Sequence, residues 1–510
     1  MVFQWHISIF SLLSLFFFIV FLLKWFFNTP KTQENLPPSP PKLPIIGNLH
    51  QIGLLPHRSL RALAQRYGPL MLLHLGGVPV LIVSSADAAH EIMKTHDLIF
   101  SNRPKSSIPS RLLYDSKDIA FAPYGEYWRQ VKSISVLHLL SNRRVQSFKH
   151  VREEETAIMI EKIRHKRSSS SSAVVNLSEM LMVLTNDVVC RVALGRKYSG
   201  GGEGGREFKE ILGGFVELLG VFNVGDYIPW LSWVNRANGL DAKVEKVVKG
   251  IDEFLEGVVK DHLERKKGKN DDGETVEEGT DFVDILLEIQ RDSSTGFPIH
   301  NETIKALIMD IFAAGTDTTF TALEWAMAEL LTHQASMKKL QNEVREVARG
   351  KSDITEDDLE KMHYLKAVIK ETLRLHPPIP LLVPRESTQD VKVMEYDIAA
   401  GTTVIINAWA IGRDLLSWEE PEEFQPERFS NGTIDYKGQH FELIPFGAGR
   451  RGCPGTLFAI RVNELALANL MLNFDFALPG GAAWEDMDMT ETNGISVHKK
   501  TPLLLVATPH

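Results

Sequence analysis

The sequence predicts a mainly α protein with a small β part, folded as one large globular unit. Apolar residues recur with helical spacing over most of the 510 residues, strand signals are short and few, and no break is long enough to separate independent domains. We expect a membrane anchor and its flank at residues 1–34, a proline-rich hinge at 35–48 and the globular domain at 49–510.

Charge and cysteine content exclude several classes of protein. The net charge is −9 with no long basic run, so we expect no nucleic-acid partner. The two cysteines, Cys190 and Cys453, lie far apart in the sequence and supply neither a disulfide framework nor a zinc site. The globular part is therefore expected to face a reducing compartment.

The N-terminus contains a seventeen-residue run without charge, ISIFSLLSLFFFIVFLL, at positions 7–23. Its length is near the lower limit for a spanning helix, and it lacks the basic start and small-residue cleavage site of a signal peptide. Lys24, Lys31 and Lys42 follow it, so the positive-inside rule places the bulk of the chain in the cytosol. We expect a retained single-pass anchor.

Proline-rich and strand-like segments come next. Five prolines within eight residues of NLPPSPPKLPIIGN, positions 35–48, favour a stiff spacer beside the membrane; an SH3-type ligand is the alternative. Residues 70–76 and 78–85 indicate a hairpin, and 402–411 another strand. Helical spacing marks 59–67, 87–95, 153–166 and 305–331. Mobility is expected at 168–172, 200–205 and 266–279.

The stretch FGAGRRGCPG, positions 446–455, surrounds Cys453 with glycines and arginines. Pro454 suits the first position of a helix, so we expect Cys453 at or just before a helix start, where the dipole and free N–H groups favour thiolate. The glycines allow close approach of something flat, and Arg451 offers a fork for carboxylates. A haem meets all three demands. A buried inert cysteine explains none of them, and a cysteine nucleophile lacks a nearby histidine.

These ten residues follow the pattern F-x-x-G-x-R-x-C-x-G and resemble the haem-binding loop of the cytochrome P-450 superfamily. The similarity runs from about Pro37 to the C-terminus and is closest to plant microsomal members acting on specialised metabolites. It implies the cytochrome P-450 fold and haem b, with Cys453 as axial ligand of the iron. Five positions carry the pattern: Phe446, Gly449, Arg451, Cys453 and Gly455.

Three further motifs strengthen the resemblance. AAGTDTT, within the predicted helix 305–331, costs that helix roughly 2 to 3 kcal/mol in propensity, so a compensating reason is expected. The family implies a groove over the haem at Ala314 and Gly315, with Thr318 steadying dioxygen and Asp317 helping to deliver protons. KETLRLHPP and PERF supply a buried structural network implied for three residues: Glu371, Arg374 and Arg428.

The resemblance also implies which side chains surround the haem edge and the substrate. Partners for the propionates are Trp128, Lys132, Arg385 and Arg451; at Lys132 the family pattern W-x-x-x-R has arginine, whose bidentate fork lysine lacks. Substrate contacts are expected from 106–121, 208–222, 313–314, 379–383 and 494–496. The candidates within these segments are Leu113, Phe121, Ala313, Ile379, Val383 and Ile495.

The implied activity is a haem-thiolate monooxygenase inserting one oxygen atom from O2 into a small apolar metabolite, such as a terpenoid, phenylpropanoid or coumarin. The chain contains no flavin or nicotinamide fingerprint, so electrons must come from outside. The family implies an NADPH-dependent reductase of the endoplasmic reticulum, docking near Arg129, Lys132, Arg450 and Arg451, and admits cytochrome b5. Alternatives are a haem-dependent aldoxime dehydratase and a non-catalytic haem sensor or carrier; the acid and alcohol at Asp317 and Thr318 favour the monooxygenase.

Overall fold

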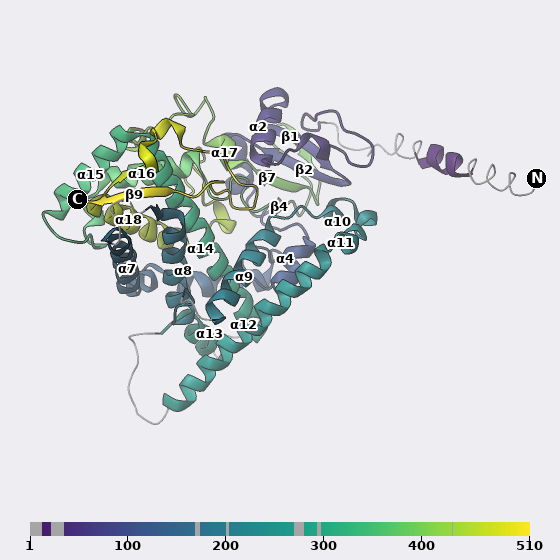
Figure 1. Cartoon of the computed structure of the whole chain (residues 1–510). Coiled ribbons are helices and arrows are strands. Elements are labelled where there is room, and N and C mark those ends of the chain that lie inside the picture. Colours follow the sequence, from purple (N-terminus) through teal and green to yellow (C-terminus); the bar gives the residue numbers. More distant parts are fainter. Residues whose placement is uncertain are drawn as a thin grey trace, which may run out of the picture.

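A computed structural model of the chain describes residues 13–21, 35–168, 174–199, 203–269, 280–292, 297–430 and 432–510. Helices dominate it, as Figure 1 shows. The α-helices with labels are α2 (Pro56–Tyr67), α3 (Ala86–His90), α4 (Ser107–Leu112), α5 (Glu126–Ile134), α6 (Asn142–Ser147), α7 (Lys149–Ser168), α8 (Leu177–Leu194), α9 (Glu203–Leu219), α10 (Val224–Tyr227), α11 (Val234–Ala237), α12 (Leu240–Lys269), α13 (Phe282–Arg291), α14 (Asn301–Thr332), α15 (Gln334–Ala348), α16 (His363–Leu375), α17 (Ala408–Ile411) and α18 (Thr456–Asn473).

The strands form three small sheets. They are β1 (Leu70–Leu75), β2 (Val78–Val83), β3 (Val175–Asn176), β4 (Arg385–Glu386), β5 (Val391–Val393), β6 (Tyr396–Ile398), β7 (Thr403–Ile406), β8 (Phe474–Ala477) and β9 (Leu504–Pro509). The largest sheet has the order β1-β2-β7-β4, in which β2 and β7 are parallel and the other neighbours antiparallel. The others are β3-β9-β8 and the hairpin β5-β6. The predicted mainly α class with a small β part is confirmed.

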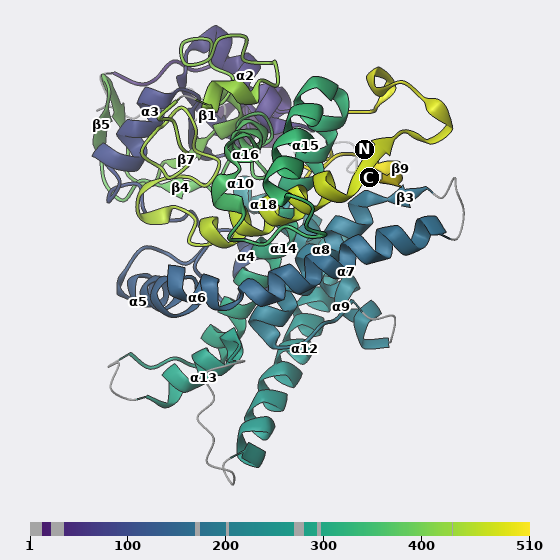
Figure 2. The ribbon, with the colours of Figure 1, turned by 90° about the vertical axis from the view of Figure 1, so that its left-hand side faces the viewer.

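The four-stranded sheet lies at one side of the molecule and the long helices at the other (Figures 1 and 2). Two separate apolar clusters cover the faces of the sheet, because alternate residues of a strand point to opposite faces. The larger core lies among the helices, where α7, α8, α14, α16 and α18 pack together. Their buried faces fix the position of α14.

Helix α14 has 32 residues and is buried over most of its length. It packs closely against α8 at Gly315, where a Cβ atom would lie 3.2 Å from Val189 Cγ2. A Cβ atom at this position would require the Val189 side chain to move by a few tenths of an ångström, which dense packing resists. Gly315 therefore serves helix packing, in addition to lining the cavity described below.

Two expected elements differ from the structure. The strand expected at 402–411 ends at Ile406, because Asn407 accepts a hydrogen bond from Ala410 N at 3.0 Å and caps the short helix α17. Pro454 is not the first residue of a helix: α18 begins at Thr456, and Gly455 is its N-cap. Cys453 consequently lies in the loop, three residues before the helix.

The N-terminal region is described in part. Residues 13–21 are helical with exposed apolar side chains, and the remainder of the expected anchor at 7–23 lies outside the described residues. Among the described helices, none is by itself both long and apolar enough to cross a bilayer; a bent pair, Lys209–Tyr227 with Pro229–Ala237, meets the length and composition together.

The proline-rich segment is attached to the folded domain. Leu72 N in β1 donates to Pro38 O at 2.9 Å, and Asn48 Nδ2 donates to Pro40 O at 3.3 Å. Asn35 Nδ2 donates to Glu395 O at 2.8 Å. The segment expected to be a spacer is therefore held along the edge of the sheet from Asn35 onward, since its carbonyl groups satisfy donors of the domain.

The three segments expected to be mobile fall largely outside the described residues: 169–173, 200–202 and 270–279. Their described flanks are helical, since α7 extends to Ser168, α9 begins at Glu203 and α12 ends at Lys269. The expected breaks are thus shorter than the sequence indicates.

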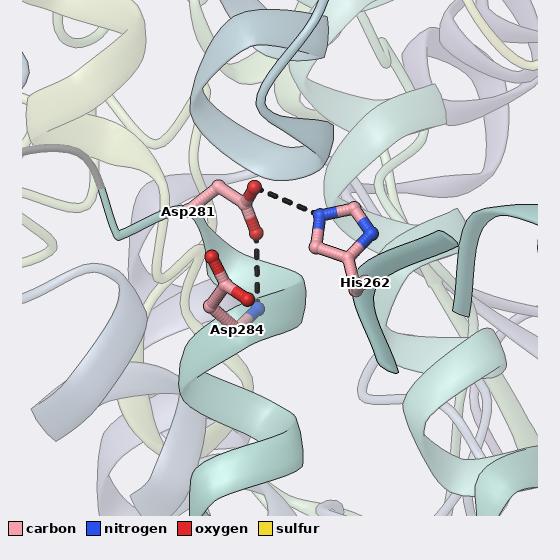
Figure 3. Close-up of side chains that lie close together, drawn as sticks. All are labelled: His262, Asp281 and Asp284. Carbon is pink, nitrogen blue, oxygen red and sulfur yellow. Dashed lines mark hydrogen bonds and ion pairs between the residues drawn. The ribbon is translucent and has the colours of Figure 1, made fainter. Parts of the chain in front are cut away.

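Helices α12 and α13 are joined by His262, Asp281 and Asp284 (Figure 3). Asp281 Oδ1 accepts from Asp284 N at 2.9 Å and caps α13, while Asp281 Oδ2 lies 2.8 Å from His262 Nε2. The Arg265 guanidinium lies 2.7 Å from the same Nε2. His262, Asp281 and Asp284 lie close enough together to hold a cation. Both Asp281 oxygens already have partners, however, and Arg265 adds positive charge. The cluster is an attachment between the two helices.

Candidate active site

A cavity of about 300 Å³ opens between α14, the loop at 446–455, α9 and the C-terminal loop. Apolar side chains make up most of its wall, which is typical of a site for a small apolar molecule. The structure brings together at this cavity all six expected substrate contacts, from four of the five expected segments of the chain: Leu113, Phe121, Ala313, Ile379, Val383 and Ile495. Phe215, Val216 and Leu219 of α9 join them.

Cys453 lies at the cavity wall, in a loop closed by its own backbone. Cys453 N donates to Phe446 O at 2.9 Å, and Phe446, Gly455 and Arg451 line the same cavity. Gly449 does not line it. Its φ is +67°, and a Cβ atom would lie 2.4 Å from Met93 O, so glycine is required there for packing of the loop against the neighbouring helical turn.

The free thiol of Cys453 differs from the expectation of a ready thiolate. Burial raises its pKa above the ordinary value, while backbone N–H groups of Gly455 and Thr456 and the Lys132 ammonium act in the opposite direction. The donors at the helix start do not outweigh burial because α18 begins three residues later. Binding of a metal ion at the sulfur would displace the proton and leave the thiolate.

Cationic side chains gather beside the loop. Arg451 donates to Ser101 O, Ile119 O and Ala122 O at 2.6 to 3.1 Å and stacks on Trp128 at 4.2 Å. Arg385 donates to Ala448 O at 2.8 Å. Burial, and to a smaller extent repulsion by the Arg385 charge, lowers the pKa of Arg451. Asp97 beside Arg385 and Asp118 near Arg451 act in the opposite direction, and the guanidinium groups together favour binding of anionic groups.

Arg103 belongs to the same group and was not predicted. It is 7% exposed and lines the cavity, and its side chain donates to the carbonyl oxygens of Ala120, Val383 and Pro384 at 2.6 to 2.7 Å. Burial and the charges of Arg451 and Arg385 lower its pKa. No sequence signal marks Arg103, because its position depends on contacts with segments far along the chain.

Two expected propionate partners have other bonds. Trp128 donates its single N–H to Ile119 O at 3.0 Å, so its indole is already used. Lys132 donates to Gly452 O at 2.9 Å, beside Cys453, and burial lowers its pKa to about 8. Four cations were expected at the face that docks the reductase. Two of them, Lys132 and Arg451, line the cavity, and the other two, Arg129 and Arg450, point outward. Arg450 is paired with Asp97 at 2.7 Å.

The donor set nevertheless fits a haem. One thiol at the cavity wall offers an axial ligand, and Arg103, Arg385 and Arg451 offer spare N–H groups for two carboxylates. Arginine has five N–H donors, so a bond to a carbonyl leaves others free. These residues would hold the group and balance its negative charge.

Helix α14 supplies the polar groups expected over the haem. Asp317 and Thr318 line the cavity with Ala313, Ala314 and Gly315. Thr318 Oγ1 donates to Ala314 O at 2.6 Å, so its oxygen is left to accept a hydrogen bond. Asp317 Oδ1 lies 3.2 Å from His498 Nε2, a partner from the C-terminal loop that the sequence did not predict.

A pair of buried acids was also not predicted. Asp310, two turns before Asp317, accepts from Ile119 N at 2.6 Å, and Asp118 Oδ2 accepts from Phe121 N at 2.7 Å. Burial raises the pKa of Asp118 to about 6, and burial together with the Asp118 charge raises the pKa of Asp310. The sequence signal that could have found Asp310 is a single acid within the apolar run ALIMDIFAAG. The pair fixes the loop that carries Phe121.

The predicted structural network is in contact and lies away from the cavity. Arg374 donates to both carboxylate oxygens of Glu371 at 2.7 Å, and Arg428 Nε lies 3.2 Å from Glu371 Oε1. Arg374 also donates to the carbonyl oxygens of Gly412 and Pro421. These bonds tie α16 to the segments that precede the loop of Cys453.

Comparison with known proteins places this geometry in a family. The family model described as Cytochrome P-450 matches residues 37–506. A curated protein of Prunus mume, cytochrome P-450 736A117, is 62% identical over 98% of this chain and 96% of its own length. A norfluorocurarine oxidase of Strychnos is 59% identical over 98% and 97%, and the (+)-menthofuran synthase of Mentha piperita 55% over 98% and 99%.

A solved structure, a zebra fish cytochrome P-450 with abiraterone, matches with a TM-score of 0.75 at 26% identity and covers 90% of this chain and 100% of its own. The cavity with one thiol, the surrounding arginines and these matches agree. The chain belongs to the cytochrome P-450 family and is a plant haem-dependent monooxygenase of that family.

Proposed function

We propose that this protein is a membrane-anchored monooxygenase that inserts one oxygen atom from O2 into a small apolar metabolite. The observation that carries the proposal is one cavity lined by the Cys453 thiol, the Asp317–Thr318 pair and an otherwise apolar wall. When haem is bound, its iron supplies the activation of dioxygen, which thiolate ligation favours. Cys453 would hold the iron through its sulfur, and Arg103, Arg385 and Arg451 would hold the propionates.

The side chains at the cavity then bind and orient the substrate and supply the proton. Leu113, Phe121 and Ile495 exclude water from the apolar substrate, which strengthens the electrostatic effect of the few polar groups. Thr318 Oγ1 accepts a hydrogen bond at the cavity while its own proton is held by Ala314 O. Asp317 passes to the cavity the proton that the reaction consumes.

Terpenoids, phenylpropanoids and coumarins are the substrate classes we propose. The named relatives include a norfluorocurarine oxidase and a (+)-menthofuran synthase, which support small-molecule substrates. Electrons are proposed to come from NADPH through a separate reductase, with cytochrome b5 as a second donor. Arg129 is an outward cation available to such an acidic partner, and Arg450 is outward but paired with Asp97.

We further propose that residues 7–23 anchor the protein in the endoplasmic reticulum membrane, with the domain from 49 to 510, and the segment 35–48 attached to it, in the cytosol. Three exposed aromatic residues support contact with a bilayer: Phe222, Trp230 and Trp233 are 50, 64 and 61% exposed. They flank α10 and α11, which lie on the same side of the domain as β1 and β2 (Figure 1). Protease protection of microsomes, with and without residues 1–34, tests this topology.

The activity is tested with microsomes that contain this chain and a reductase. The reduced, carbon monoxide-bound protein is expected to show a main band shifted far to the red, and Cys453→Ala to lose it. Cys190→Ala is the matched control, because that buried thiol lies outside the cavity. A globin-like band in the wild type would contradict thiolate ligation.

Substrates are then sought in a panel of terpenoids, phenylpropanoids, coumarins and aldoximes. We expect spectral shifts on binding and one atom of ¹⁸O from ¹⁸O2 in the product. Nitrile formed from an aldoxime without oxygen consumption would instead assign the dehydratase reaction.

A further inference from the structure

Asp317 is paired with a histidine from the other end of the chain. His498 Nε2 lies 3.2 Å from Asp317 Oδ1, and His498 Nδ1 lies 2.7 Å from Thr321 Oγ1. Thr321 is one helical turn after Asp317 on α14 and also lies 2.7 Å from Asp317 O. Among the residues that the structure describes, His498 is the basic side chain that forms an ion pair with Asp317.

The hydrogen bonds indicate the protonation of the imidazole. Thr321 has one hydroxyl proton, which it donates to Asp317 O in the usual pattern for threonine in a helix. With that proton on Asp317 O, Thr321 Oγ1 accepts from His498 Nδ1 and the Asp317 carboxylate accepts from Nε2. In this arrangement both ring nitrogens carry protons, which is the imidazolium form.

The surroundings of His498 agree with this state. Burial lowers its pKa, but the hydrogen bond and the charge of Asp317, with a further contribution from Glu324, outweigh burial and raise it. Lys499 is the adjacent cation, and its amide N–H donates to Glu324 Oε2 at 3.1 Å. The Phe320 ring lies 5.4 Å from the imidazole.

The position of His498 is fixed by its neighbours in the loop. His498 N donates to Thr492 Oγ1 at 3.1 Å, and Thr492 N donates to His498 O at 2.8 Å. Trp325 Nε1 donates to Val497 O at 2.8 Å, which ties the loop to α14. The same loop carries Ile495 to the cavity.

His498 lies behind Asp317 as seen from the cavity. Asp317 lines the cavity and His498 does not, yet 22% of the His498 side chain is accessible. On this placement the imidazole offers Asp317 a proton that need not cross the apolar wall. The two side chains form a short sequence of ionisable groups that ends at the cavity.

We propose that His498 is a positioning residue that orients Asp317 and supplies it with the proton used at the cavity. The inference rests on the proposed monooxygenase function, which consumes protons there. In the step, the Nε2–H bond of the imidazolium breaks and an O–H bond forms on Asp317, with no change in electron count. Asp317 releases its proton into the cavity, and neutral His498 takes one back from water.

The first test measures the protonation of His498 directly. The full-length protein with ¹³C-labelled histidine, in its reduced, carbon monoxide-bound form, is titrated by NMR, and the signal absent in His498→Gln is assigned to His498. We expect its pKa to lie above the ordinary value and to fall by about one unit or more in Asp317→Asn. Thr318→Ala should leave it unchanged. A pKa that Asp317→Asn does not alter would overturn the proposal.

The second test measures turnover with any panel compound that the wild type oxidises. His498→Gln is expected to keep the red-shifted band but to lose about tenfold or more of the product formed per NADPH, with a larger solvent isotope effect. His498→Lys, which keeps a cation, should recover part of the loss. His333→Gln is the matched control, since His333 pairs with Glu329 of the same helix at 3.2 Å and does not line the cavity.

The pH profile separates a proton role from a packing role. A raised pKa keeps His498 charged below that pKa, so product per NADPH in the wild type should fall as pH rises through it, and His498→Gln should remove this dependence. Normal coupling in His498→Gln would overturn this inference and leave the monooxygenase proposal intact. If the wild type oxidises no compound, the function proposal fails, while the NMR titration still decides the Asp317–His498 pair. Should His498→Gln not fold, Thr321→Val serves instead and is expected to lower the pKa of His498.

Discussion

Arg374 donates to both carboxylate oxygens of Glu371 at 2.7 Å, and 1% or less of either residue is exposed. Two parallel bonds between planar groups fix both orientation and distance. Because Arg374 also donates to carbonyl oxygens of the segments after α17, this pair joins α16 to the part of the chain that leads to Cys453.

Glu371→Ala should therefore destabilise the protein by about 3 to 5 kcal/mol, because a buried guanidinium is left without its charge partner. The free energy of unfolding, and the fraction of protein with the red-shifted band, measure the loss. Glu360→Ala is the matched control: this glutamate pairs with Lys366 and Arg461 but its side chain is 60% exposed. An exposed pair should cost about 1 kcal/mol or less. Equal losses in the two variants would contradict the network.

Thr318→Ala should keep haem and stability but divert electrons from NADPH into hydrogen peroxide. The hydroxyl lines the cavity and leaves its oxygen to accept a hydrogen bond there. Peroxide and product formed per NADPH are the measurements. Thr332→Ala removes the same kind of hydroxyl bond, to Ala328 O at 3.2 Å on the same helix, away from the cavity, and should remain coupled. Full coupling in Thr318→Ala would exclude the proposed role.

Glu329 should make stability depend on acid pH. Burial by itself raises its pKa, but hydrogen bonds from His333 and His376 outweigh burial and lower it to about 2. A carboxyl pKa that is lower in the folded state stabilises the fold at pH values above the unfolded pKa of about 4.3. This contribution, of the order of 3 kcal/mol, is lost as the pH falls toward 2. Unfolding free energies between pH 5 and 2 should fall less steeply in Glu329→Gln than in the wild type. The exposed Glu346→Gln should follow the wild type.

Asp310 should tolerate asparagine but not alanine. Its Oδ2 accepts from Ile119 N at 2.6 Å, and burial with the neighbouring Asp118 charge raises its pKa. An amide oxygen can accept the same bond without a charge, whereas alanine leaves a buried N–H unpaired at about 1 to 3 kcal/mol. Substrate-induced spectral shifts and unfolding free energies check both variants. An equal effect of Asn and Ala would show that the bond to Ile119 is unimportant.

The sequence alone determined the features that depend on local pattern. The period of apolar residues predicted α14 and the other long helices, because a helix must bury one face whatever it packs against. The motif around Cys453 marked the thiol, and AAGTDTT marked Asp317 and Thr318, because propensity makes such residues costly in a helix without another reason.

Tertiary structure decided which distant residues complete the site. His498 reaches Asp317, and Arg103 reaches Arg451, through contacts between segments whose separation along the chain carries no periodic signal. The same packing used the Trp128 N–H for Ile119 O and gave Gly449 a role against Met93 rather than at the cavity. The whole three-dimensional arrangement decides which acceptor each donor meets and which backbone segments approach closely, whereas a sequence pattern reflects only neighbours along one element.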